Sequence, residues 1–180
     1  MKNKFQIFFL LLVLAGCCGS RGPRTKAGFV PRMNLVEILF KSMDESVFFA
    51  GPLLFKSAVG NDEIKLDFTA TVLKQTCDSV KCNFTLFSEK PEVNKESISV
   101  KTSDTVLTKT RLELMFANTY KKKFQYRYSF YLSYLEYLKI LDSSEPAFIF
   151  DSKTFIPPRR WDKNASEMKV KLGWLTSGYM

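Results

Sequence analysis

The sequence predicts a mainly β protein, an antiparallel sandwich or small barrel with one or two short helices, with an α+β fold as the alternative. Polar and apolar residues alternate along several short segments, which is typical of strands with one buried face. Hydrophobic residues make up 46% of the 180-residue chain and include 17 Phe and 7 Tyr, enough to fill a core. No apolar run beyond the first 16 residues approaches the length of a membrane-spanning helix.

Period-two alternation predicts the individual strands. It is clearest where Ile64, Leu66 and Phe68 are separated by charged residues. The segments with this pattern are 64–72, 80–86, 98–100, 106–116 and 124–132. The residues Met168, Val170, Leu172 and Trp174 alternate again, so we expect a last strand that closes the sheet.

Two capping boxes predict short helices. Asn34–Glu37 begins one, with Leu35, Ile38, Leu39 and Met43 on one side of the helix that would follow. Ser133–Glu136 begins the other, where the strand alternation fails and Leu135, Leu138 and Leu141 follow at helical spacing. Alternatively, residues 134–141 prolong the preceding strand through a bulge.

The chain begins with a segment typical of export signals. Lys2 and Lys4 precede an apolar run over residues 5–14, which is shorter than the roughly 20 residues that a spanning helix needs. The next residues, Leu14-Ala15-Gly16-Cys17, resemble the lipobox of bacterial lipoproteins. The resemblance implies that diacylglycerol is coupled to the Cys17 thiol, and that cleavage just before Cys17 makes it the first residue of the mature chain.

This resemblance divides the chain into a signal peptide over 1–16, a lipidated basic tether over 17–33 and one β-rich globular domain over 34–180. In that family, a residue other than Asp after the lipidated Cys usually permits release to the outer membrane, and here that residue is Cys18. We therefore expect a lipid anchor in the cell envelope, on an outer membrane, facing the periplasm or the surface. Cys18 would remain unpaired there.

The tether is basic. Removal of residues 1–16 leaves 25 basic and 18 acidic groups, a net charge of +7. Four of the basic residues precede the first acid, Glu37, and we expect them to lie along anionic headgroups: Arg21, Arg24, Lys26 and Arg32. The alternative is a linker without contact to the membrane.

Two N-glycosylation patterns favour a different origin. Asn83-Phe84-Thr85 and Asn164-Ala165-Ser166 each match the acceptor triplet. A secreted eukaryotic or host-interacting glycoprotein with an ordinary signal peptide is therefore the alternative to the lipoprotein.

Cys77 and Cys82 lie between two predicted strands, so a tight hairpin turn over residues 78–81 would bring them within range of a disulfide. Two buried free thiols are the alternative. We expect no metal site, because a closed zinc site takes four ligands and the chain has no His.

The absence of His also excludes Ser-His and Cys-His nucleophile pairs and HExxH zinc sites. A glycosidase with two carboxylates stays possible, with Asp62-Glu63 or Asp44-Glu45 as candidates. No Gly-rich phosphate loop or dinucleotide fingerprint occurs, so we expect no cofactor. Our prediction is a protein without catalytic activity.

Two segments are candidates for binding. Lys121-Lys122-Lys123 precedes alternating aromatic residues, a mixture that suits nucleic acid, but strand alternation separates the basic and the aromatic faces. We interpret it as a core behind a solvated basic face and expect no nucleic acid. The loop over 155–163 contains Pro157-Pro158 and presents Arg159, Arg160 and Trp161, residue types enriched at interface hot spots. The alternative is a loop with Trp161 folded onto the domain.

Together these patterns predict a membrane-anchored envelope lipoprotein that acts as a non-catalytic binding or assembly subunit, with an envelope protein as its partner. The secreted glycoprotein is the second hypothesis, and a carbohydrate-active enzyme is the third.

Overall fold

The computed structural model describes residues 34–89, 91 and 96–177. The signal segment, Cys17 and the four basic tether residues lie outside this part of the chain. The described residues fall within the range 34–180 predicted for the globular domain.

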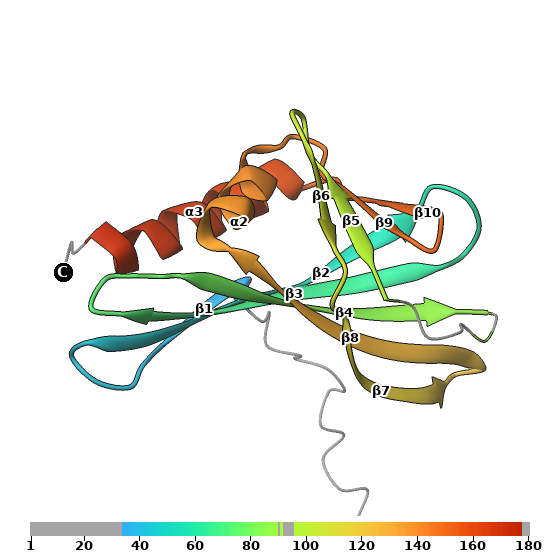
Figure 1. Cartoon of the computed structure of the whole chain (residues 1–180), viewed down its shortest axis with the longest axis horizontal. Helices are drawn as coiled ribbons and strands as arrows, with labels where there is room; N and C mark the ends of the chain where they lie inside the picture. Colours follow the sequence, from blue (N-terminus) through green and yellow to red (C-terminus); the bar gives the residue numbers. More distant parts are fainter. Residues whose placement is uncertain (1–33, 90, 92–95, 178–180) are drawn as a thin grey trace, which may run out of the picture. The chain divides into compact units, whose positions relative to one another are not determined.

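The prediction of a mainly β, antiparallel fold with two helices is confirmed (Figure 1). Within the described residues, ten strands form one sheet in the order β6-β5-β9-β10-β2-β3-β4-β8-β7, with β1 paired to β2 beside this path. The strands are β1 (Val36–Phe40), β2 (Glu45–Ser57), β3 (Glu63–Leu73), β4 (Ser79–Ser88), β5 (Ile98–Lys101), β6 (Val106–Lys109), β7 (Glu113–Tyr120), β8 (Lys123–Ser133), β9 (Ala147–Phe150) and β10 (Lys153–Ile156).

The sheet curls into a half-barrel, so that strands far apart in its order face each other across the core. Phe150 on β9 packs against Phe84 on β4 and Tyr128 on β8, with ring centroids 5.2 and 5.4 Å apart. The inner face is filled mainly with aromatic side chains. The fully buried Phe residues are Phe48, Phe55, Phe68, Phe84, Phe148, Phe150 and Phe155.

Two helices cover part of this inner face. They are α2 (Tyr134–Asp142) and α3 (Trp161–Ser177), and both lie on the same side of the sheet in Figure 1. Tyr137 on α2 joins them, because its ring lies 5.0 Å from that of Phe68 and its hydroxyl donates to the Met168 sulfur on α3 at 3.6 Å. Neither of these described helices has the length and apolar composition needed to cross a bilayer.

The predicted strands over 64–72, 80–86, 98–100 and 124–132 correspond to β3, β4, β5 and β8. The strand predicted over 106–116 is instead two strands, because β6 pairs with β5 at one edge of the sheet and β7 with β8 at the other. The second capping box is confirmed. Ser133 Oγ accepts from the Glu136 backbone N–H, and Glu136 Oε2 accepts from the Ser133 N–H at 2.7 Å, so residues 134–141 are helical.

Two predicted elements are wrong. Asn34–Glu37 does not begin a helix, because pairing with β2 from Val36↔Ala50 onward makes this segment a strand. The last segment is not a strand but the helix α3. The buried residues of α3 are Trp161, Ala165, Met168 and Leu172, which follow the helical period, whereas Val170 and Trp174 are half exposed.

The predicted disulfide is also wrong, and Cys77 and Cys82 are free, buried thiols. The turn joining β3 to β4 lies at Lys74-Gln75, both with positive φ, rather than over residues 78–81. Both cysteines therefore follow the turn, five residues apart along one side of the hairpin. Extended chain rises about 3.3 Å per residue, which separates them far beyond the roughly 4.4 to 6.8 Å between bridged Cα atoms.

Candidate functional site

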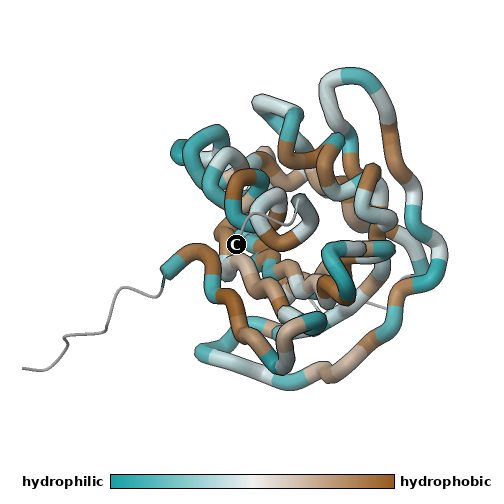
Figure 2. The backbone as a smooth tube through the Cα atoms, turned by 90° about the vertical axis from the view of Figure 1, so that its left-hand side faces the viewer, coloured by the Kyte–Doolittle hydropathy of each residue, from teal (hydrophilic) through white to brown (hydrophobic). Residues whose placement is uncertain are grey.

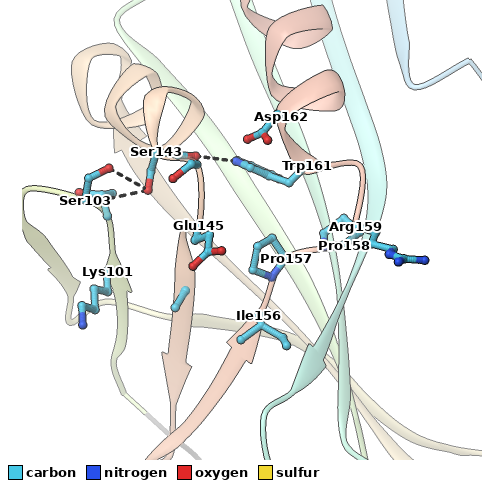
Figure 3. Close-up of a pocket in the computed structure, with 13 residues that line it drawn as sticks. Lys101, Ser103, Ser143, Glu145, Ile156, Pro157, Pro158, Arg159, Trp161 and Asp162 are labelled. Atoms are coloured by element: carbon cyan, nitrogen blue, oxygen red, sulfur yellow. Dashed lines mark hydrogen bonds between the residues drawn. The ribbon is translucent and has the colours of Figure 1, made fainter.

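The loop that contains the predicted binding residues borders an open groove of about 740 Å³ (Figure 3). Its walls come from the segment before α3, the end of α2 and the loop between β5 and β6. The residues that line it include Lys101, Ser103, Ser143, Glu145, Pro157, Pro158, Arg159, Trp161 and Asp162.

Trp161 does not present its side chain to a partner, so the prediction of an exposed anchor is wrong. Trp161 is only 2% exposed. Its indole Nε1 donates to the Ser143 carbonyl oxygen at 2.7 Å, and its ring meets that of Phe55 edge-on with centroids 5.7 Å apart. As the first residue of α3, Trp161 lies on the buried helix face, where its large apolar surface stabilises the core. Arg159 and Arg160 remain exposed.

The polar groups of the groove connect loops rather than form a catalytic arrangement. Ser103 donates to Ser143 Oγ from its backbone N–H at 3.2 Å and from its hydroxyl at 3.3 Å, as Figure 3 shows. The charged lining residues are of both signs, with Lys101 and Arg159 alongside Glu145 and Asp162. The groove thus has neither the uniform charge nor the nucleophile and base pair that would identify a ligand or a reaction.

The carboxylates nominated for a glycosidase lie at opposite ends of β2. Asp62, after the far end of β2, forms an ion pair with Lys153 at 2.8 Å, whereas Glu45, at its start, pairs with Lys41 at 2.7 Å. Each of the two alternative acid pairs thus has one carboxylate engaged by a lysine. Within the described ranges, no group of three or more His, Cys, Asp or Glu residues could hold a metal ion.

The outer face of the sheet carries a polar network that includes Asn83, one of the two predicted glycosylation sites, whereas the other, Asn164, is partly exposed on α3. Arg127 Nη2 donates to both carboxylate oxygens of Asp67, at 2.9 and 3.1 Å, and its Nη1 donates to Thr85. Asn83 Nδ2 donates to Asp67 at 2.8 Å, and Asn83 is only 7% exposed. A glycan on Asn83 does not fit this fold, since Asn83 is buried and its acceptor nitrogen donates to the Asp67 carboxylate.

The surface that stands out is the edge strand β7, which ends the sheet order and pairs with β8. All eight of its residues are exposed, including four large apolar or aromatic ones. These are Leu114, Met115, Phe116 and Tyr120. The pairing places Leu114 on the inner face with Tyr128, and Phe116 on the outer face with Arg127.

At alternate residues of β7, the backbone N–H and C=O groups point away from β8, toward the open edge of the sheet. The two-residue turn between β3 and β4 serves as a comparison for the turn between β7 and β8. There, the flanking residues Leu73 and Thr76 exchange two backbone hydrogen bonds of 2.9 Å. In the β7–β8 turn, Lys121 and Lys122 have positive φ, as Lys74 and Gln75 do in the β3–β4 turn. Tyr120 and Lys123, which flank the turn, are therefore a pair joined by backbone hydrogen bonds. Because bonded and outward-facing residues alternate along the strand, the N–H and C=O groups of Ala117 and Thr119 point to the open edge.

Natural sheets usually protect an exposed edge with Pro, inward charges or a very short strand. β7 has eight residues, contains no Pro or Lys, and carries one bulge between Leu114 and Phe116. Sequence reasoning missed this site, because the apolar residues of the predicted strand 106–116 were expected to be half buried. Comparisons of the chain with family models, with curated proteins and with solved structures gave no match.

Proposed function

We propose that this protein is a non-catalytic binding protein, tethered to an envelope membrane through acylated Cys17, that binds an extended segment of a partner protein along β7. The observation that carries the proposal is the long open edge formed by eight consecutive exposed residues, which a single bulge between Leu114 and Phe116 interrupts. An added strand would satisfy the outward backbone groups of Ala117 and Thr119, and these hydrogen bonds supply affinity without dependence on sequence.

Side chains beside the edge provide specificity. A bound strand presents successive side chains to opposite faces, so one set would contact Leu114 on the inner face and the other Phe116 on the outer face. The partner segment should therefore contain alternating apolar residues. Aromatic and apolar cross-strand pairs of this kind contribute roughly 0.2 to 1 kcal/mol each.

Charge at the two ends of β7 further defines the partner. Lys121 and Lys122 are exposed after the strand, and Arg111 is exposed just before it. Glu113 is already engaged, since it accepts from the Ser129 hydroxyl at 3.0 Å. Basic residues at both ends favour a segment with acidic residues at its ends. They disfavour a second copy of this chain, because antiparallel self-pairing brings Arg111 toward the Lys121-Lys122 turn of the other copy.

The proposed anchor keeps this edge near the membrane. Asn34 lies seventeen positions after Cys17, which allows a reach of at most roughly 55 to 60 Å at 3.3 to 3.6 Å per residue. Two or three acyl chains hold a protein durably, whereas one chain holds it only marginally. The secreted glycoprotein is the weaker hypothesis, because Asn83 is buried against Asp67.

The anchor is tested by growth of a bacterial expression host with an alkyne fatty acid. We expect label on the wild-type chain, recovery of the chain in the membrane fraction, and loss of both in Cys17→Ala. A wild-type chain that carries no acyl group and stays outside the membrane fraction contradicts the anchor.

The edge is tested by panning displayed short peptides against the full chain. We expect selected peptides to have alternating apolar residues with Asp or Glu near both ends. Binding should be lost in Thr119→Pro, which removes an outward N–H and blocks the edge while the ladder to β8 is kept.

Thr108→Pro is the matched control, because Thr108 lies on β6, the edge strand at the opposite end of the sheet order. The backbone hydrogen bond between Thr102 and Thr105 sets the alternation along β6, so the Thr108 N–H also points to an open edge. Binding that survives Thr119→Pro, or equal loss in both variants, refutes the β7 site. A wild-type dimer that Thr119→Pro dissociates would assign the edge to a second copy instead.

A further inference from the structure

We propose that one end of the domain inserts apolar side chains directly into the lipid surface on which the protein is anchored. The end is formed by the β1–β2 loop, the β3–β4 turn and the last turns of α3. We call it the apolar end, and its residues are Leu39, Phe40, Met43, Leu73 and Trp174. The inference rests on the proposed function only for the tether that brings the domain to the membrane.

The three segments of the apolar end lie side by side. The Lys74 backbone N–H in the β3–β4 turn donates to the Asp44 carbonyl in the β1–β2 loop at 2.7 Å. Met43, Trp174 and Leu175 line the same small hollow of about 70 Å³. Figure 2 looks onto this end of the domain.

Large apolar side chains are exposed both in the β1–β2 loop, at Met43, and at the adjoining ends of β1, β3 and α3. Met43 is 98% exposed, and Leu39, Phe40, Leu73 and Trp174 are each 54 to 57% exposed. Turns and loop tips normally carry small polar residues, because they face water. A cluster of large apolar residues at such a tip indicates a surface that is covered by something else in the working protein.

A bilayer fits this surface better than a protein groove does. Trp favours the boundary between headgroups and acyl chains, and Phe and Leu are common beside it on surfaces that enter this boundary. Basic residues accompany them, since Lys41 and Lys74 lie in the two turns and Lys171 lies one helical turn before Trp174. Lys41 pairs with the acid Glu45 at 2.7 Å, and the same loop contains the exposed acid Asp44, so the positive charge of this end rests on Lys74 and Lys171. Apolar tips surrounded by lysines match an anionic lipid surface.

The course of β1 is compatible with this orientation. β1 starts at Val36, opposite Ala50 in the middle of β2, and runs toward Phe40 at the apolar end. The tether joins the domain only a few residues before that strand. Its maximum reach of roughly 55 to 60 Å exceeds the roughly 40 Å length of the 13-residue β2, so the acyl group and the apolar end can occupy the same bilayer.

The two Trp residues of the chain make the test direct. Trp174 belongs to the apolar end and is 56% exposed, whereas Trp161 is 2% exposed in the core. The full acylated chain is reconstituted into vesicles of phosphatidylcholine and phosphatidylglycerol, with or without bromine on the acyl chains. Bromine quenches only indoles that it can contact. We expect loss of most Trp174 emission in the brominated vesicles, and no change in the Trp161 emission that remains in Trp174→Phe.

Variants of the apolar end identify the contact. Phe40→Asp combined with Met43→Asp should abolish the quenching of Trp174. Val59→Asp should leave it unchanged, since Val59 is 85% exposed in the loop at the other end of β2. Flotation of the vesicles, measured in parallel, reports the tether separately from the insertion.

Each outcome decides the proposal. Flotation without bromine quenching of Trp174 refutes insertion and leaves the anchor standing. Protection of Trp174 from iodide without bromine quenching also refutes it, and assigns the apolar end to a protein or to a second copy. Failure to float refutes the anchor, and shows as well that the apolar end does not hold the protein on lipid.

Discussion

Gly51 is the position where we expect a single added methyl group to be most costly. It lies in β2 at the point where the register with β3 shifts between Ala50 and Leu53. Its φ is +117°, and its N–H donates to the Leu35 carbonyl at 2.9 Å. A Cβ at this position would lie 2.7 Å from the Leu66 carbonyl oxygen and 3.0 Å from the Asp67 Cα atom.

Two costs combine in Gly51→Ala. A non-glycine residue held at such a φ costs on the order of 1 to 3 kcal/mol. The contacts with β3 are with backbone atoms, which cannot rotate away, and overpacking of this kind costs about 1 to 3 kcal/mol more. We expect a loss of roughly 2 to 5 kcal/mol, a large fraction of the roughly 5 to 15 kcal/mol that stabilises a typical domain.

The assay is equilibrium urea unfolding followed by tryptophan fluorescence, with the free energy taken from the midpoint and the slope. Gly60→Ala is the matched control, because Gly60 has φ +90° but nothing within 4 Å of the added Cβ. It should lose only about 1 to 2 kcal/mol. Gly173→Ala, in helix α3 with open space around it, should gain up to about 1 kcal/mol. Equal losses in Gly51→Ala and Gly60→Ala would refute the close approach of β2 to β3.

Three further predictions concern a turn, an ion pair and a buried hydroxyl. Lys122→Gly should raise the free energy of unfolding by about 1 kcal/mol, because Lys122 has φ +66° in a two-residue turn; an unchanged urea midpoint would contradict this. Burial tends to raise the pKa of Glu136, but hydrogen bonds from Lys109 and Ser133 outweigh burial and lower it. The Glu136 carboxylate therefore stabilises the fold above its unfolded-state pKa of about 4.3, and this stabilisation is lost as pH falls through the lower folded-state pKa. In Glu136→Gln, the free energy of unfolding should fall less steeply as the pH is lowered through this range. Tyr137→Phe should change stability by less than about 1 kcal/mol, since only a weak sulfur acceptor is lost, whereas Tyr137→Ala should cost about 3 to 5 kcal/mol; comparable urea unfolding curves for the two would be inconsistent with the packing of α2.

Local sequence patterns correctly predicted the strands that have one apolar and one polar face. The strand around Phe68 buries every second residue. In the strands around Phe84 and Tyr128, mainly apolar residues on the inner face alternate with mainly polar ones on the outer face, so the pattern is visible in the chain itself. The capping box at Ser133 is likewise a contact between residues three apart. Such features depend on neighbours along the chain, and sequence reasoning therefore found them.

Other elements depend on distant contacts. The Asn34 segment has a helix-start pattern, but pairing with β2 outweighs it. In α3, alternating apolar residues suggested a strand, yet the core selected Trp161, Ala165 and Met168 at helical spacing. Helix propensities differ by well under 1 kcal/mol per residue for most residue types, so burial against the sheet decides between such alternatives.

The candidate sites divide in the same way. The sequence drew attention to Trp161, but the contacts of that indole with Ser143 and Phe55 are visible only in the folded chain. The β7 edge and the apolar end were not predicted, because exposure of Phe116 or Met43 depends on which elements cover them. The lipobox at Cys17 is a sequence observation alone.

Residue order by itself determined the mainly β class, the principal strands and the start of α2, because alternation and capping act over a few residues. Only the tertiary structure decided that β7 ends the sheet, that Trp161 is buried and that Met43 and Trp174 come together at one end. The physical reason is that burial and strand pairing join residues far apart in the chain, and no local pattern specifies which partner each surface will find.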